Sequence, residues 1–290
     1  MVSVIVPTMA SAQRRESLQR AVASIRSSSL RPVQIIAVVN GDRRDPETCS
    51  WLEAQPDVLV AYAAKPSAPG AILRGRELVQ TEYFCMLDDD DEYLPGATDQ
   101  KVAALQASEH SDFLVANAYV CSNGAERLQY QNIGSIVEDP LASLMRFNWL
   151  HNGNALYRSS SVGTAFFEDY HPYAEWTWLA FKLVMGAKRV TTLEAPVFRY
   201  NDTAGSLSKS GAYNDSLMPL FQRMLERQPP PHIVRMIHSK RSAAYHDAST
   251  EAMSAGRRAE AWKYHLKSLM LNGGFRYIGY TRHLLLAKPS

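Results

Sequence analysis

Residues 83–92 read YFCMLDDDDE, an apolar run that passes directly into five acidic residues. The apolar half predicts a buried strand, and the acidic half places five carboxylates at the end of that strand. Crowded carboxylates repel one another more strongly as they lose water, and a divalent cation offsets this repulsion. Carboxylate oxygens are the ligands that Mg²⁺ and Mn²⁺ prefer. The stretch therefore predicts a metal–phosphate site, with a solvated turn before the helix after Pro95 as the alternative.

The residues around this stretch predict a parallel sheet. Apolar runs at 2–6, 33–39 and 58–63 predict strands, and residues 16–27 and 71–79 predict helices between them. Strands that alternate with helices form right-handed βαβ units and hence a parallel sheet. Ligands in such sheets bind beyond the carboxyl ends of the strands, which is where the acidic run lies. The predicted fold class is α/β, a Rossmann-like, mostly parallel sheet flanked by helices.

The last 80 residues differ from the rest in pattern and in charge. Beyond residue 211 only helical patterns occur, whereas 189–193 and 197–200 still read as short strands. Residues 211–290 contain 12 Lys and Arg against 5 Asp and Glu, and residues 1–210 contain 19 against 24. We therefore expect an α/β domain over 1–210 and a basic helical C-terminal region over 211–290.

The composition of the 290-residue chain excludes several classes of protein. Hydrophobic residues make up 46% and charged residues 21%, which is ordinary for a globular protein. An acidic body repels phosphate backbones, so no nucleic-acid partner is expected. The three cysteines, at 49, 85 and 121, lack the spacing of a disulfide framework or a zinc site. With no signal peptide and no long apolar stretch, we expect a cytoplasmic protein, with peripheral contact at the inner face of the membrane as a further hypothesis.

Three segments in order carry a family resemblance. Residues 4–8 (VIVPT), 35–41 (IIAVVNG) and 82–90 (EYFCMLDDD) resemble family 2 glycosyltransferases of the GT-A fold. Residues 173–176 and 195–200 are similar to the acceptor half of that family, so the resemblance covers about residues 2–208.

The resemblance implies a GT-A catalytic domain over 1–210 and a matching activity. Residues 1–110 would form the nucleotide-sugar half of this domain, and residues 111–210 would form the acceptor half. The implied reaction is a metal-dependent, inverting transfer of a sugar from a nucleotide diphosphate, with a UDP-sugar favoured. The acceptor would be a hydroxyl of a glycan or lipid-linked glycan, in the biosynthesis of a surface polysaccharide.

The acidic run matches the DxD motif of the family. The resemblance implies that Asp90 is the ligand of Mn²⁺ or Mg²⁺ and that Asp89 lies near the ribose of the donor. Asp88, the first residue of the motif, would support both from the end of the strand and is the second candidate metal ligand. Pro7 and Thr8 lie where the end of the first strand of the family meets the nucleotide.

Two asparagines stand where the family usually has other residues. Asn40 occupies the place of an Asp beside the uracil ring, and an amide can both accept from and donate to the base. Asn201 occupies the place of a His that often contacts the metal or the phosphates, so the third metal ligand is left unassigned.

Three arginines are candidates for contact with the diphosphate. Arg74 and Arg76 lie on the predicted helix at 71–79, and one of them would reach the phosphates; a solvated helix surface is the alternative. Arg199, with the loop that contains Ser206 and Ser208, would close over the phosphates.

Inverting transfer needs a general base that takes the proton of the acceptor hydroxyl. The family places this base at the start of a helix, about eleven residues before a glycine, and counting back from Gly186 gives Glu175. Glu168 and Asp169 are competing candidates, and a stabilising role at the helix N-terminus is the alternative for Glu175. His151 either contacts the substrate or packs as an ordinary side chain.

The tail and the overall function each leave alternatives open. Residues 255–285 mix aromatic and basic side chains, which is typical of contact with an anionic membrane surface; a homodimer interface and a helical cap are the alternatives. A degenerate, non-catalytic family member would bind a nucleotide or a partner without turnover. A nucleotidyltransferase needs a glycine-rich basic loop after the first strand, and residues 11–15 (SAQRR) contain arginines but no glycine.

Overall fold

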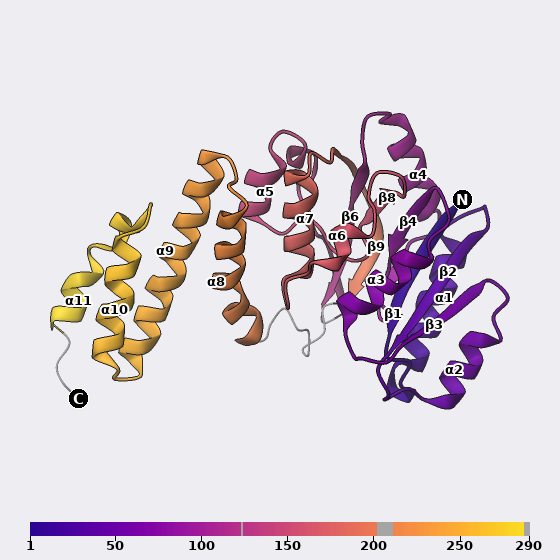
Figure 1. Ribbon diagram of the computed structural model, residues 1–290, viewed down its shortest axis with the longest axis horizontal. Helices are drawn as coiled ribbons and strands as arrows, with labels where there is room; N and C mark the ends of the chain where they lie inside the picture. Colours follow the sequence, from indigo (N-terminus) through magenta and orange to yellow (C-terminus); the bar gives the residue numbers. More distant parts are fainter. Residues whose placement is uncertain (123, 202–210, 287–290) are drawn as a thin grey trace. The chain divides into compact units, whose positions relative to one another are not determined.

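The computed structural model describes residues 1–122, 124–201 and 211–286. The chain separates into two compact units, residues 1–209 and residues 210–290, which we call the sheet unit and the helical unit. In Figure 1 the sheet unit runs from indigo to salmon, and the helices of the helical unit run from orange to yellow. Each unit is described by itself.

The described part of the sheet unit contains a nine-stranded sheet, whose order is β3-β2-β1-β4-β8-β6-β9-β5 with β7 beside β6. The strands are β1 (Val2–Thr8), β2 (Val33–Asn40), β3 (Val58–Ala63), β4 (Tyr83–Met86), β5 (Glu92–Tyr93), β6 (Phe113–Ser122), β7 (Ala125–Leu128), β8 (Ala155–Arg158) and β9 (Val190–Asn201). Strands β5, β7 and β8 run antiparallel to their neighbours, and the other strands are parallel to one another.

Seven α-helices and two short 3₁₀ turns belong to the described sheet unit. They are η1 (Ala12–Arg14), α1 (Arg15–Ser27), α2 (Pro46–Glu53), α3 (Ala68–Leu78), α4 (Ala97–Ala107), η2 (Gly134–Ile136), α5 (Pro140–Arg146), α6 (Ala165–Glu168) and α7 (Glu175–Met185). Three of these helices begin in the same way, because a side-chain oxygen accepts a backbone N–H and a proline occupies the first turn. The capping residues are Asp45, Ser67 and Asp139.

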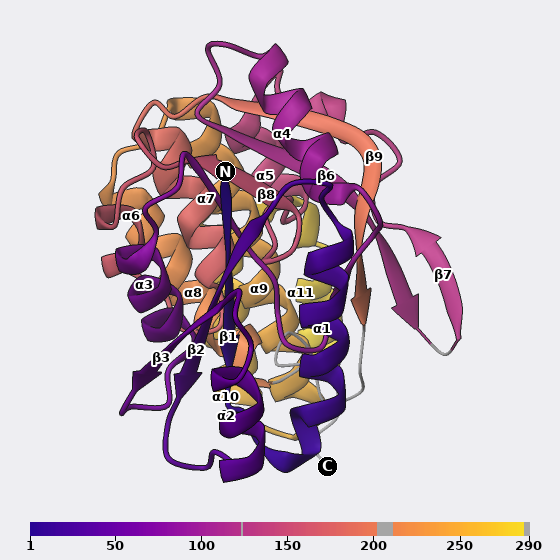
Figure 2. The same ribbon diagram turned by 90° about the vertical axis from the view of Figure 1, so that its right-hand side faces the viewer.

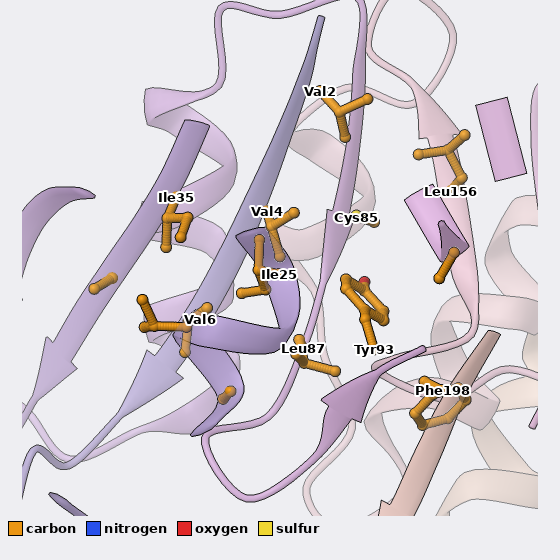
Figure 3. Close-up of a cluster of buried hydrophobic side chains, with 14 of the residues drawn as sticks. Val2, Val4, Val6, Ile25, Ile35, Cys85, Leu87, Tyr93, Leu156 and Phe198 are labelled. Carbon is orange, nitrogen blue, oxygen red and sulfur yellow. The ribbon is translucent and has the colours of Figure 1, made fainter. Parts of the chain in front are cut away.

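Helices cover both faces of the sheet, as Figure 2 shows for α1 and α3. Alternate residues of β1 point to opposite faces, so Val4 and Val6 cluster with Ile25 of α1 (Figure 3). Ile5 faces α3, where Gly75 permits close approach: a Cβ at this glycine would lie 2.3 Å from Cγ2 of Ile5. The central strands β1, β2 and β4 are therefore buried on both faces, as the continuous apolar runs predict, whereas the edge strand β3 is partly exposed.

The strand order defines one edge of the sheet as the place for a site. From β1 the chain builds outward to β2 and β3 and then returns to place β4 on the other side of β1. Ligands of open α/β sheets bind at such a switch point, beyond the carboxyl ends of the strands. Because β8 runs antiparallel, its beginning lies at the same edge, and residues 151–154 precede it there.

Strand β9 differs from the sequence prediction. The residue pattern predicts two short strands, 189–193 and 197–200, whereas the structure has one strand over Val190–Asn201. Pro196 cannot donate a ladder hydrogen bond, and the pairing with β6 shifts register on both sides of Asn117, opposite this proline. The irregular pairing lets the strand continue through the proline.

The helical unit consists of helices joined by short turns. They are α8 (Gly211–Glu226), α9 (Pro231–Ser254), α10 (Arg258–Leu269), η4 (Gly274–Tyr277) and α11 (Tyr280–Leu286). Helices α9 and α10 meet through small polar contacts, among them Ser242 Oγ donating to the carbonyl of Ser268 at 3.0 Å. Within the described residues, no helix combines the length and apolar character needed to cross a membrane.

Candidate functional site

The acidic run lies at the switch point between β1 and β4. Residue Ile5 pairs with Met86, and this register continues to place Thr8 beside Asp89. The hydroxyl of Thr8 donates to Asp89 Oδ2 at 2.6 Å, and Arg14 Nη1 donates to Asp89 Oδ1 at 2.9 Å. The same Arg14 nitrogen lies 2.6 Å from Asp90 Oδ2. The end of β1 and the turn η1 therefore hold two of the acidic side chains.

Two further acidic side chains, those of Asp88 and Asp91, are held by the segment before β8 and by β9. Asn152, in the segment before β8, donates its amide Nδ2 to Asp88 Oδ1. The backbone N–H of Asn201 donates to the buried Asp91 Oδ1 at 2.9 Å. The Asn201 amide Nδ2 donates to the main-chain oxygen of Asp90 at 2.6 Å, so this nitrogen is committed to the backbone of the run.

Burial and mutual repulsion make these carboxylates weaker acids than usual. Burial, with the negative charge of Asp90 as the next cause, raises the pKa of Asp88 to about 7. Burial also raises the pKa of Asp89, and it raises the pKa of Asp91 well above the ordinary range. Such a cluster gains from a positive charge, and Arg14 supplies one.

A divalent cation fits the chemistry of these residues. Within the described residues, no three His, Cys, Asp or Glu side chains converge as a metal site. However, Mg²⁺ is commonly held by one or two carboxylates together with substrate phosphates. Among residues 88–91, Asp88 and Asp90 keep some exposed surface, although the carboxyl of Asp88 is enclosed by protein, and Oδ1 of Asn152 is buried without a hydrogen-bond partner in the described structure. This set of oxygens suits a cation that arrives with a diphosphate.

The residues predicted to meet the nucleotide lie together at the same edge. Asn40 ends β2, is 8% exposed, and donates its Nδ2 to the carbonyl of Thr8 at 3.1 Å. The structure therefore brings Thr8, Asn40 and Asp89 together, although they are far apart in the sequence. Pro7 precedes Thr8 in β1, where its side chain is buried opposite Val38.

The arginines predicted to reach the diphosphate have other partners. Arg74 forms an ion pair with Glu77 at 2.9 Å on α3, and Arg199 forms one with Glu126 at 2.6 Å. The buried guanidinium of Arg76 donates to main-chain carbonyls, including that of Val162 at 2.9 Å. Contact of Arg74 or Arg199 with phosphates stays a prediction. Ser206 and Ser208 lie outside the described residues.

The candidate base opens a helix beside a small cavity. Glu175 begins α7, and its Oε1 accepts the backbone N–H of Tyr173 at 3.0 Å. The cavity measures about 30 Å³ and is lined by Glu175, Trp176 and Asp169, among others. Glu168, by contrast, is exposed at the end of α6. Two of the three candidate bases therefore line one cavity, whose lining includes none of the residues 88–91.

His151 packs among aromatic rings in the structure. Its ring centroid lies 6.3 Å from those of Tyr130 and Tyr200, and Nε2 lies 3.1 Å from the carbonyl of Asn148. Burial lowers the pKa of His151 to about 4, so the ring is neutral at physiological pH.

Sequence reasoning missed two residues that hold the acidic run. Arg14 carries a signal, because it is a cation directly after the first strand and before a helix. Asn152 carries a weaker signal, because its position at the site follows only from the antiparallel direction of β8.

Comparisons with known proteins identify the class. The sequence model of glycosyl transferase family 2 matches residues 3–165, more than half of the chain. The chain therefore belongs to this family and is a glycosyltransferase. No curated protein matches the chain.

Solved structures of S. aureus TarS share the fold. TarS 1-349 in complex with UDP-GlcNAc has a TM-score of 0.60 and 15% identity, covering 97% of this chain and 92% of that chain. A second structure of TarS 1-349 has a TM-score of 0.63 and 13% identity, and the match covers 97% of this chain and 91% of that chain. A structure of a longer TarS chain has a TM-score of 0.61 and 14% identity, and the match covers 81% of this chain but only 42% of that TarS chain. The predicted GT-A-type α/β fold with a helical extension is confirmed.

Proposed function

We propose that the protein transfers a sugar, with inversion, from a UDP-sugar to a hydroxyl of a glycan or lipid-linked glycan, in surface polysaccharide biosynthesis. The observation that carries this proposal is the convergence of Thr8, Asn40 and the acidic run 88–91 at the switch point between β1 and β4. Structures of TarS, which share the fold, are described with UDP-GlcNAc and with UDP.

The donor-binding roles follow from the chemistry of the side chains at the carboxyl ends of β1, β2 and β4. Asn40 would contact the uracil ring, and Asp89 would lie near the ribose. Asp90, with Asp88, would hold Mn²⁺ or Mg²⁺, which when bound neutralises the charge that develops on the leaving diphosphate. Burial first, and the negative charge of Asp90 second, raise the pKa of Asp88, and a bound cation would favour the ionised form of this carboxyl against both causes.

The acceptor proton needs a base, and Glu175 is our choice. The acceptor oxygen attacks the anomeric carbon, the bond from that carbon to the diphosphate oxygen breaks, and the acceptor proton passes to the Glu175 carboxylate. The position of Glu175 at the start of α7 supports this assignment. Asp169, which lines a small cavity together with Glu175, is the second candidate.

Release of the free nucleotide diphosphate tests the proposed reaction. The full chain is incubated with UDP-GlcNAc, UDP-glucose and GDP-mannose, with Mn²⁺ or with a chelator, and free UDP or GDP is measured. We expect slow hydrolysis of a UDP-sugar that stops when the metal is removed. Metal-dependent binding of a UDP-sugar without hydrolysis would instead favour a non-catalytic family member. Release of pyrophosphate from a nucleoside triphosphate and a sugar phosphate would favour a nucleotidyltransferase.

We also propose that the helical unit contacts an anionic membrane surface. Residues 255–286 contain six Lys and Arg and one acidic residue, Glu260, which pairs with Arg257 at 2.9 Å. Large apolar side chains are exposed among them: Met270 is 86% exposed and Phe275 is 77% exposed. Along α10 and the residue that follows it, positions 263, 266, 267 and 270 repeat at helical spacing as Lys, Leu, Lys and Met, all exposed. Exposed apolar groups beside basic ones suit an anionic headgroup layer.

Sedimentation with lipid vesicles tests this contact. The variant Lys263→Glu/Lys267→Glu reverses two charges on the exposed face of α10, and Arg31→Glu, at an exposed arginine of the sheet unit, is the control. We expect the wild type and the control to bind phosphatidylglycerol-containing vesicles, more weakly as salt rises, and the double variant to lose binding. Equal binding to neutral phosphatidylcholine vesicles would contradict the proposal. Concentration-dependent dimerisation that the double variant abolishes would favour the homodimer interface instead.

A further inference from the structure

Arg14 is the counter-ion of the acidic run. Among the ion pairs of the described residues, it is the only cationic side chain bonded to residues 88–91, at 2.9 Å from Asp89 and 2.6 Å from Asp90. The neighbouring arginine has other partners, because Arg15 pairs with Asp45 and with Glu47. A single guanidinium thus joins two consecutive carboxylates at the switch point.

The place of Arg14 in the fold leaves its guanidinium accessible. Residue 14 ends the turn η1 and directly precedes α1, so its main chain is fixed between β1 and the helix. Its side chain is 38% exposed, whereas that of Asp89 is only 10% exposed. The guanidinium can therefore change partners at the open side of the site while Asp89 stays in place, bonded to Thr8.

Arg14 competes with the divalent cation of the proposed function. The oxygen of Asp90 that contacts Arg14 belongs to the carboxylate that would hold the metal. A guanidinium and a divalent cation on one carboxylate repel each other at short distance. Occupation of Asp90 by the metal thus requires Arg14 to withdraw, and the diphosphate of the donor brings oxygens that a guanidinium binds well.

We infer that Arg14 is a donor-binding residue that exchanges partners. Without donor it neutralises Asp89 and Asp90, and with donor its guanidinium moves from Asp90 to the oxygens of the nucleoside diphosphate. This inference rests on the proposed function, because it requires a nucleoside diphosphate with its cation at the acidic run. The metal alone meets the positive charge of Arg14, and the nucleotide alone meets the negative charge of the carboxylates. Each ligand therefore binds more tightly when the other is present.

The exchange gives the substitution Arg14→Gln two effects of opposite sign. Without nucleotide, Mn²⁺ meets carboxylates that are no longer neutralised, so its affinity rises. With Mn²⁺ present, UDP loses a contact to its phosphates, so its affinity falls. Couplings of this kind typically change affinity by about 5–150-fold, and we expect about tenfold in each direction. A residue that only maintains the local structure would weaken both.

The experiment measures the two affinities separately. Free Mn²⁺ is followed by electron paramagnetic resonance in a titration without nucleotide, and UDP binding is measured by calorimetry at saturating Mn²⁺. The proteins are the full-length wild type, Arg14→Gln, Arg14→Lys and the control Arg15→Gln. We expect Arg14→Lys to keep the wild-type Mn²⁺ affinity, because it keeps the charge, and Arg15→Gln to leave both affinities unchanged.

The outcomes separate this inference from the proposed function. If the wild type binds UDP and Arg14→Gln leaves both affinities unchanged or moves both in one direction, the exchange is wrong and the proposed function stands. If the wild type binds no UDP at any Mn²⁺ concentration, the proposed function fails and the inference fails with it. Tighter Mn²⁺ and weaker UDP in Arg14→Gln, with Arg15→Gln unchanged, supports the exchange.

Discussion

The sheet unit and the helical unit differ in what they bury. The sheet unit packs large rings into its interior, and Trp149 and Trp178 are almost completely buried there. Between α9, α10 and α11 the helical unit has a cluster of three buried apolar residues, Ala252, Ala261 and Leu284. Among its described residues, the other buried apolar ones lie on α8 and the first turns of α9, and they include a single aromatic ring, that of Phe221. Small polar contacts such as Ser242 with Ser268 join the same helices.

This difference in packing indicates which unit can support a catalytic site and which can offer a surface for a partner. A site that depends on fixed positions of charged groups needs rigid support below it. The strand that leads into the acidic run supplies it, because Cys85 and Leu87 are fully buried (Figure 3). The helical unit instead leaves Met270 and Phe275 in solvent, which suits a surface for a partner rather than a catalytic centre. We therefore expect turnover and membrane contact to be separable by mutation.

The largest expected effect is a loss of catalytic rate, with vesicle binding unchanged, when the candidate base in the sheet unit is substituted. Glu175→Gln keeps size and hydrogen bonding but cannot take the acceptor proton, and general-base catalysis contributes about 10²–10⁴-fold. We expect the rate of UDP-sugar hydrolysis to fall by that factor, with UDP affinity and vesicle binding close to wild type. Asp169→Asn is the comparison, because this residue lines the same cavity. An active Glu175→Gln with an inactive Asp169→Asn would move the base to Asp169.

The difference in packing gives the next effect. Leu18 and Leu284 are both almost fully buried, the first in the core of the sheet unit and the second in the small cluster of the helical unit. Truncation of a buried leucine to alanine costs about 2–5 kcal/mol, and the cost is larger where the surroundings cannot collapse into the cavity. Chemical denaturation should show a greater loss of stability for Leu18→Ala than for Leu284→Ala. A greater loss of stability for Leu284→Ala than for Leu18→Ala would contradict the claim that the sheet unit is the more tightly packed of the two.

The smallest expected effect concerns pH and again tests the packing of the sheet unit. Burial lowers the pKa of His151 to about 4, below its ordinary value of 6.5. Between these values the unfolded chain binds a proton that the folded chain does not, so acidification removes stability. Relative to His151→Gln, the wild type should lose stability as pH falls from 6.5 to 4. His110→Gln, at an exposed histidine, is the control, and a constant difference between wild type and His151→Gln would contradict the burial of this ring.

The sequence predicts much of the fold because burial on both faces leaves continuous apolar runs. It also predicts that Thr8, Asn40 and Asp89 share an edge, since carboxyl ends of parallel strands meet there. It could not predict the contact of Asn152 with Asp88, because that depends on the antiparallel direction of β8. It also could not predict that Arg76 turns to the carbonyl of Val162, 86 residues away.

Calorimetric titration with UDP tests the central claim most directly, namely that the acidic run binds a nucleoside diphosphate through a divalent cation. The wild type is titrated with UDP in the presence of Mn²⁺ and in the presence of a chelator, beside Asp90→Ala and Glu92→Gln. Glu92 is the matched control, because it is the fifth acid of the run and pairs with Arg20 at 3.3 Å. We predict Mn²⁺-dependent binding in the wild type and Glu92→Gln, and none in Asp90→Ala. Equal UDP binding by the wild type and Asp90→Ala, with or without Mn²⁺, would contradict the claim.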